Sequence, residues 1–233
     1  QDENKVVSER DVRIANIAEK NIVTGEYAEY WRKTRYGKIV GHPVLVKLDS
    51  LDREFMHVAG DTMELHEDLG QTHVRGSVVI KQEKTVATSR EATYFKKEER
   101  TLLTGEPKVV QRNREITGDT LSIFMKDNQL SRALVKGSAM VASDADTLNK
   151  GRWVNKLTGY EMDFLFREGQ LQRVVIEHQA TSVYHVIEDN QYKGANEVSG
   201  DKIKVTFLAG VLQRVEVTSK PEFSSGKYSP PKI

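Results

Sequence analysis

The sequence predicts an all-β protein made of stacked repeats, and two observations support that fold class. In the stretch Ile116 to Val141, apolar and polar residues alternate on both sides of a polar turn at Asp127-Asn128. Period-two alternation is typical of strands with one apolar face. The same unit then returns along the whole chain, and no window of the sequence has a convincing helical period. We therefore expect strands joined by polar loops, with little or no helix.

Six copies of the unit align on two key positions, which are mostly glycine. The two positions are 16 residues apart in the first three copies (25 and 41) and 19 apart in the last three (118 and 137). A fixed period signals stacked supersecondary units, none of which can bury its apolar face alone. The first key position is occupied by Gly25, Gly60, Ser89, Gly118, Gly159 and Gly200. The second key position is occupied by Gly41, Gly76, Gly105, Gly137, His178 and Ser219.

The repeat continues past the middle of the chain, which predicts a single continuous β-repeat domain over residues 1–223. At its start, Val12, Ile14 and Ile17 are expected to begin a first strand or a capping layer. Residues 224–233 contain Pro230-Pro231 and are expected to form an irregular tail. The copies lie near residues 23–46, 58–82, 87–111, 116–141, 157–184 and 198–223.

Glycine at the key positions indicates tight corners between layers rather than contacts with a ligand. Gly adopts left-handed conformations freely and lets backbones approach closely. Pairs such as Gly118-Asp119 suit such a corner, where the carboxylate is expected to accept hydrogen bonds from nearby amides. Asn128 stands where the later copies have Gly169 and Gly210. Asn is the next most tolerant residue in the left-handed region.

Composition excludes several classes of function. The chain has 35 Lys and Arg against 34 Asp and Glu, so no net charge recruits nucleic acid or acidic lipid. No run of about 18 apolar residues is present, which predicts no membrane-spanning helix. Cysteine is absent, which excludes disulfides and thiolate metal sites. The sequence starts at Gln1 without Met or a signal peptide, which we interpret as a trimmed or mature N-terminus.

The sequence predicts no catalytic, metal or cofactor site. The six histidines form no metal-ligand motif, and neither a nucleophile elbow nor a phosphate-binding loop occurs. His66 and His73 are seven residues apart, as are His178 and His185, a spacing that within one strand places the two on opposite faces. The Gly-Asp pairs resemble calcium-binding repeats, but each glycine has only one acid beside it. We therefore expect no enzyme, no metal and no cofactor.

The alternating apolar residues of the last three copies form one face, which has two interpretations. In the first it is a closed core, and each residue is there only for packing. In the second it is a groove, open along one side, that holds acyl chains. Each methylene group kept from water contributes about 0.8 kcal/mol, so a lipid that crosses water needs a continuous apolar track. The candidate lipid-binding residues are Leu121, Ile123, Met125, Val135, Ala139, Val141, Met162, Phe164, Phe166, Val174, Ile176, Ala180, Ile203, Val205, Phe207, Val215 and Val217.

The stretch Ile116 to Val141 carries a Thr-Gly-Asp-x-Leu-x-Ile half followed by Leu-x-x-Ala-x-Val-x-Gly-x-Ala. Leu157 to Ala180 and Val198 to Val217 follow the same pattern, and Val58 to Lys81 is a short form of it. In this pattern the sequence resembles the OstA-like family of periplasmic lipopolysaccharide-transport proteins, which includes LptA and the N-terminal domain of LptD. The resemblance covers about Val23 to Phe223.

This resemblance implies a β-jellyroll of V-shaped strand layers with an apolar interior that binds lipopolysaccharide. It implies a non-enzymatic bridge that shields the acyl chains of lipid A between the inner and outer membranes, and therefore a periplasmic location. Exposed strand edges at the open ends of the stack imply pairing with a second copy or with other OstA-like transport components.

Two other functions stay open at this point. A structural or adhesive β-repeat protein would bind partners by its outer face or strand edges without lipid, and a sealed interior would favour it. A polysaccharide-acting enzyme would need two or three carboxylates that converge in a groove, and the sequence contains no such cluster.

Overall fold

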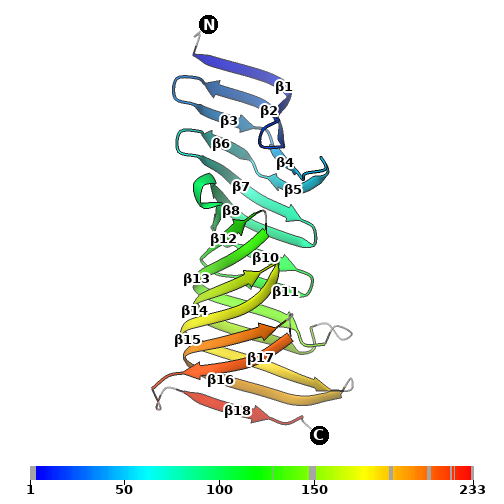
Figure 1. The fold of residues 1–233 in the computed structure, drawn as a ribbon, viewed down its shortest axis with the longest axis vertical. Coiled ribbons are helices and arrows are strands. Elements are labelled where there is room, and N and C mark those ends of the chain that lie inside the picture. Colours follow the sequence, from blue (N-terminus) through cyan, green and yellow to red (C-terminus); the bar gives the residue numbers. More distant parts are fainter. Residues whose placement is uncertain are drawn as a thin grey trace. The chain divides into compact units, whose positions relative to one another are not determined.

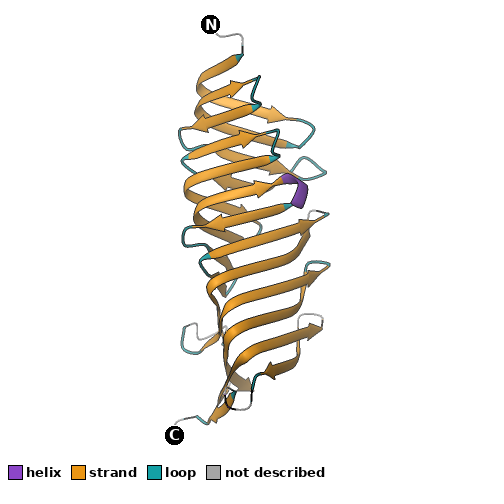
Figure 2. Ribbon diagram, turned by 90° about the vertical axis from the view of Figure 1, so that its left-hand side faces the viewer, coloured by secondary structure: helices purple, strands orange, loops and turns teal. Residues whose placement is uncertain are grey.

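The computed structural model describes residues 4–127, 129–146, 151–188, 191–208, 211–220, 222 and 224–231. Within them the chain is almost wholly antiparallel strand, with one short 3-10 helix, η1 (Lys96–Glu98) (Figure 2). The prediction of an all-β fold with little helix is confirmed. Two compact units make up the chain, residues 1–109 and 110–233, and each is described by itself. That all copies form one continuous domain stays a prediction.

Unit 1 holds the first two copies and most of the third. Its strands alternate in direction, and each pairs with its neighbours in antiparallel register. The strands, labelled in Figure 1, are β1 (Lys5–Asn16), β2 (Asn21–Trp31), β3 (Tyr36–Val40), β4 (Val44–Leu48), β5 (Glu54–Ala59), β6 (Thr62–His66), β7 (Gln71–Gln82), β8 (Thr85–Phe95) and β9 (Arg100–Thr104).

Unit 2 holds the three longer copies, and its strands are longer and less interrupted. The strand β10 (Lys108–Gln111) contains the boundary between the two units. The strands of unit 2 are β11 (Arg114–Thr117), β12 (Thr120–Lys126), β13 (Gln129–Asp144), β14 (Val154–Arg167), β15 (Gln170–Glu188), β16 (Gln191–Leu208), β17 (Val211–Thr218) and β18 (Ser225–Ser229).

In the first five copies the layer bends at the second key position, where two consecutive residues adopt the left-handed conformation. In β13 these are Gly137 (φ +71°) and Ser138 (φ +47°). The pairing of β13 with β14 shifts register at this bend, between Lys136 and Ala139. The same pair of positive φ angles occurs at residues 41–42, 76–77, 105–106 and 178–179. The bend divides a layer into a first arm, between the two key positions, and a second arm, beyond them.

The buried apolar side chains of both arms lie on the side enclosed by the bend, which we call the inner face. On β13 the side chains of Val135, in the first arm, and Ala139, in the second, are both almost inaccessible. Side chains alternate between faces along a strand, so the residues between them point to the outer face. This arrangement confirms the V-shaped layers of a β-jellyroll.

A sixth bend of this kind lies in β1 and was not predicted. Arg10 (φ +66°) and Asp11 (φ +49°) form it, and the pairing of β1 with β2 shifts register there, between Glu9 and Val12. Val12, predicted to begin a first strand or cap, lies just after the bend and is buried, like Val78 after the bend in β7. The sequence does not signal this bend, because neither of its residues is glycine.

Glycine at the first key position is required by close packing. The five glycines there have no positive φ. A Cβ atom at Gly118 would overlap Cγ1 of Val135 on the neighbouring strand, and one at Gly60 would lie 2.5 Å from Cγ1 of Val74. The exception is Ser89, whose counterpart on the next strand is Leu103. The expectation of close backbone approach is therefore confirmed here, while the left-handed conformation belongs to the second key position.

The acidic residue after the first key position packs over the bend. The backbone N–H of Asp119 donates to the carbonyl oxygens of Lys136 (3.0 Å) and Gly137 (2.8 Å). Its carboxylate lies where a Cβ atom of Gly137 would stand. Asp61 and Gly76 repeat both contacts in unit 1. It is thus the amide of the acidic residue, rather than its carboxylate, that bonds to the backbone of the bend.

The predicted irregular tail is wrong for residues 225–229, which form β18. This strand pairs with the second arm of β16, from Ala195 opposite Ser229 to Ser199 opposite Ser225. Pairing with the free edge of β16 supplies main-chain hydrogen bonds that the local sequence, rich in Ser, Gly and Pro, does not signal. Residues 225–229 are therefore the second arm of the layer whose first arm is β17.

Candidate functional site: the inner face

Two rows of apolar side chains cross the first arms of unit 2 on the inner face. In each row, every residue stands directly opposite the next across a pair of antiparallel strands, from β12 to β17. The deep row, nearer the bends, is Leu121, Val135, Met162, Ile176, Ile203 and Val217. The rim row, farther from the bends, is Ile123, Ala133, Phe164, Val174, Val205 and Val215.

Most of these side chains are buried against one another. Val135, Met162, Ile176 and Ile203 are 0% exposed, and a fully buried aliphatic side chain contributes roughly 1.5–3 kcal/mol relative to an exposed one. The row ends on β17, where Val215 and Val217 are 45% and 39% exposed; among the described residues, β17 pairs at these positions with β16 alone. The interior is therefore packed along its length and open at β17.

The other predicted lipid-binding residues extend this face in two directions. Ala139 and Ala180 are buried just after the bends, and Val141 lies half-buried in the second arm opposite Ile116 and Leu157. Met125, Phe166 and Phe207 lie near the hairpin turns, beyond a register shift, and are half-buried. The structure thus brings the predicted set together on one face, and whether that face holds lipid stays a prediction.

The outer face of unit 2 carries ion pairs between neighbouring strands. Arg132 donates to the two carboxylate oxygens of Asp163, at 2.7 and 3.2 Å, which raises the pKa of Arg132. Lys204 lies 2.9 Å from Glu216, and this hydrogen bond holds the pKa of Glu216 below its usual value. Such exposed pairs are each worth about 0–1 kcal/mol. These pairs therefore add little to the stability of the sheet. Their main effect is to mark the outer face as the one that is solvated.

His66 and His73 contact each other, contrary to the opposite faces predicted from their spacing. Residues 67–70 form a turn between β6 and β7, so the two histidines belong to different strands. Their rings meet edge to face with centroids 5.2 Å apart. Burial, with added repulsion from His66 and Arg75, lowers the pKa of His73. In the part of the chain that the structure describes, no three His, Asp or Glu side chains are placed to hold a metal ion.

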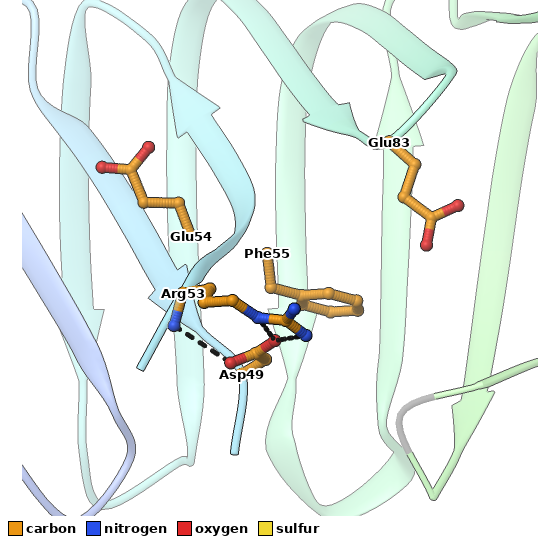
Figure 3. A pocket seen from close by; sticks show the side chains of 5 residues that line it. All are labelled: Asp49, Arg53, Glu54, Phe55 and Glu83. Atoms are coloured by element: carbon orange, nitrogen blue, oxygen red, sulfur yellow. Dashed lines mark hydrogen bonds and ion pairs between the residues drawn. The ribbon is translucent and has the colours of Figure 1, made fainter. Parts of the chain in front are cut away.

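Two pockets of the described structure lie away from the apolar rows. The pocket in unit 1 is a charged surface hollow (Figure 3). In it the backbone N–H and guanidinium of Arg53 both bond to Asp49 and, with the Leu51 N–H, lower the pKa of Asp49. Its lining is Asp49, Arg53, Glu54, Phe55 and Glu83. The pocket in unit 2 is lined by Val110, Asn113, Arg114, Glu115, Ala142, Ser143, Asp144 and Val154.

The fold and the inner face define a class of protein, the stacked-layer β-jellyrolls with a continuous apolar face. A family model described as the LptA/(LptD N-terminal domain) LPS transport protein matches residues 87–211, more than half of the 233-residue chain. The chain therefore belongs to the LptA/LptD N-terminal family of lipopolysaccharide transport proteins. The predicted resemblance to the OstA-like family is confirmed.

Comparisons with solved structures and with curated sequences add less to the assignment of the family. The crystal structure of LptH, the LptA homologous periplasmic component of the lipopolysaccharide transport device from Pseudomonas aeruginosa, matches with a TM-score of 0.46. It is 19% identical, over 63% of this chain and 95% of that chain. No curated protein sequence matches. Among the described residues, no helix is long and apolar enough to cross a membrane.

Proposed function

We propose that this chain binds lipopolysaccharide and carries it across the periplasm, with the acyl chains held against the inner face of unit 2. The observation that supports this most is the pair of unbroken apolar rows in a member of a lipopolysaccharide transport family. The role is transport rather than catalysis, and its location, by membership of the family, is the periplasm. Other transport components of the same fold, or a second copy of the chain, are the expected protein partners.

The dimensions of the rows suit an acyl chain. Neighbouring strands lie about 4.8 Å apart, so the six strands of a row extend roughly 24 Å. That length exceeds the roughly 15 Å hydrocarbon depth of one bilayer leaflet. Because each layer presents a similar pair of apolar side chains, a hydrocarbon chain meets nearly constant surroundings along the row. Each methylene group kept from water contributes about 0.8 kcal/mol.

The burial of the inner face sets a condition on binding. With Phe164 only 4% exposed, a lipid can reach it only if the two arms of the layer move apart. Contacts between arms are then exchanged for contacts with hydrocarbon, an exchange of one apolar surface for another. The same burial is what favours the rival function, a structural or adhesive β-repeat protein that binds partners by its outer face.

Photo-crosslinking to purified lipopolysaccharide separates these functions. A benzophenone amino acid replaces either Phe164, on the inner face, or its chain neighbour Leu165, on the outer face and 39% exposed. Leu165 serves as the control because no ion pair is lost there, whereas Asp163 is bonded to Arg132. We expect a crosslink at position 164 and none at 165. Val215, on the inner face but exposed, is a third site where the bulky side chain is tolerated.

A folded protein that crosslinks to lipopolysaccharide at neither position 164 nor position 215 would contradict the proposal. Folding is monitored by circular dichroism and by the midpoint of thermal unfolding. Equal crosslinking at 164 and 165 would likewise contradict it, because the label would then report adsorption to the surface.

A further inference from the structure

The rim row of unit 1 differs in chemistry from the rim row of unit 2. It occupies the same place in the repeat, and its residues stand opposite one another across β2, β3, β6, β7, β8 and β9. Four of its six residues are Tyr or Thr, whose side chains carry a hydroxyl group. The row is Tyr30, Gly37, Leu65, Thr72, Tyr94 and Thr101.

The difference is confined to this row. The deep row of unit 1 is as apolar as that of unit 2, and consists of Ala28, Ile39, Met63, Val74, Ala92 and Leu103. The facing row on the second arms of unit 1 is apolar too, and consists of Ile14, Val23, Leu45, Val58, Ile80 and Ala87. The fold itself therefore does not demand hydroxyl groups at the rim.

Three of the four hydroxyls are available to a ligand. The hydroxyl of Tyr30 donates to Oε1 of Glu67 at 3.1 Å. Within the described residues, the hydroxyls of Thr72, Tyr94 and Thr101 bond to no other protein group, and none is shielded from solvent. Tyr and Thr hydroxyls each donate one hydrogen bond and accept others. The row thus offers polar contacts next to an apolar floor.

Tyr94 is the most accessible of the three, at 37% exposed. It lies near the ion pair between Lys96 of η1 and Glu19 of the β1–β2 turn, whose atoms are 2.7 Å apart. Burial, and then Glu99 and Glu19, raise the pKa of Tyr94 above its ordinary value. Its phenol is protonated at neutral pH in any case and can donate a hydrogen bond. Lys96 and Glu19 belong to opposite arms of unit 1, and their contact places charged groups at the open side of its inner face.

We propose that Tyr30, Thr72, Tyr94 and Thr101, the hydroxyl row, form a subsite for the ester or amide groups that join acyl chains to their head group. The three available hydroxyls, those of Thr72, Tyr94 and Thr101, donate hydrogen bonds to the carbonyl oxygens of these groups. This inference rests on the proposed lipid binding and names the part of the ligand that unit 1 recognises. A carbonyl oxygen taken from water without a hydrogen bond costs roughly 1–3 kcal/mol, and the hydroxyl row removes that cost. The rim row of unit 2, with no polar side chain, accepts only hydrocarbon.

The test removes the three available hydroxyls while keeping shape, in the triple variant Thr72→Val, Tyr94→Phe and Thr101→Val. Binding is measured for two probes, purified lipopolysaccharide and diphenylhexatriene, a fluorescent hydrocarbon with no hydrogen-bonding atom. We expect the affinity for lipopolysaccharide to fall about 10- to 100-fold, as the loss of two or three hydrogen bonds implies. The affinity for diphenylhexatriene should stay within about twofold.

Two controls accompany it. Thr88→Val makes the same change on the outer face of β8, where Thr88 is exposed, and should leave both affinities unchanged. Thr72→Ser with Thr101→Ser keeps both hydroxyls and should retain lipopolysaccharide binding. A wild-type affinity for lipopolysaccharide in the triple variant would overturn the subsite and leave lipid binding standing. An equal loss of both probes would also overturn it, whereas wild-type protein that binds neither would overturn the proposed function itself.

Discussion

Gly118 and its equivalents depend on the branching of one side chain on the neighbouring strand. All five glycines at the first key position face a Val or Ile on the neighbouring strand, such as Val74 or Val135. A Cγ atom of that side chain occupies the place where a Cβ atom of the glycine would stand. Ser89 is tolerated opposite Leu103, because Leu carries a single Cγ that can turn away from the strand in front. Ser89 then bonds to its own strand, donating from Oγ to the carbonyl of Glu91 at 2.9 Å.

We predict that Gly118→Ser lowers the free energy of unfolding by about 1–3 kcal/mol, the usual cost of overpacking a core. Adding Val135→Leu recreates the Ser89–Leu103 pair and should recover part of that loss. The measurement is a double-mutant cycle by urea denaturation, with an expected coupling of roughly 0.5–3 kcal/mol. Strictly additive costs would show that Cγ branching is not what excludes the side chain.

β18 is held to the second arm of β16 by few contacts. All but one of its residues are exposed, and it buries no apolar side chain. Gly194 (φ +130°) makes room for it, since a Cβ atom there would lie 2.5 Å from the carbonyl oxygen of Ser229. The Tyr228 hydroxyl donates to the carbonyl of Lys193, and the Ser199 and Ser225 hydroxyls are 2.8 Å apart. Such a strand is among the first elements expected to open.

The prediction for this element concerns Gly194→Ala. The added methyl group collides with β18, so we expect hydrogen exchange to accelerate in residues 225–229 and in the part of β16 that faces them, 195–199. Residues 202–208, which pair with β17, serve as the internal control and should keep their protection. Unchanged exchange in 225–229 would show that β18 adjusts to the methyl group without opening.

Strand edges are the feature that matters for the whole molecule. Figure 1 shows β1 as the outermost strand of unit 1, paired along one side with β2. It is 12 residues long and exposes Val6 (43%), Val7 (45%) and Ile14 (47%). A long edge strand with exposed apolar residues is a template for pairing with another chain. This feature supports the proposed association with a second copy or with related transport components.

We therefore predict concentration-dependent self-association through β1. Replacing Val6 and Val7 by Lys adds charge to the edge and should weaken association by about tenfold or more, as charged edge residues do in natural sheets. Sedimentation velocity over a range of concentrations measures the effect. Val86→Lys, at an exposed site in β8, is the control and should change nothing. Wild-type protein that stays monomeric at the highest concentration would rule out this edge as an interface.

Much of the fold could be predicted because the repeat is visible residue by residue. Alternation around Leu121 and Ile123 indicates strands, and the aligned copies indicate which residues share a face. On that basis every residue of the two apolar rows of unit 2 except Ala133 was among the predicted residues. Half of the hydroxyl row can be found in the sequence, since Tyr30 and Tyr94 occupy equivalent positions in the repeat. Thr72 and Thr101 can be assigned to the row only once the register of the neighbouring strands is known.

Other features had no local signal. The bend at Arg10-Asp11 lacks glycine, and three of the five residues of β18 are Ser or Gly, which are common in turns. The contact of His66 with His73 depends on the turn between β6 and β7, which spacing alone does not reveal. Each of these is settled by pairing with another strand, and pairing energies do not appear in a single stretch of sequence.

The all-β class, the six aligned copies and the apolar face follow from the amino-acid sequence alone, because periodicity of side chains is a local property that each copy repeats. Where the layers bend, which residues face each other across strands, and the packing of the interior of unit 2 become visible only in the folded chain. The reason is physical. A one-residue change of register moves every side chain to the other face, and register is fixed by the sum of contacts along two paired strands.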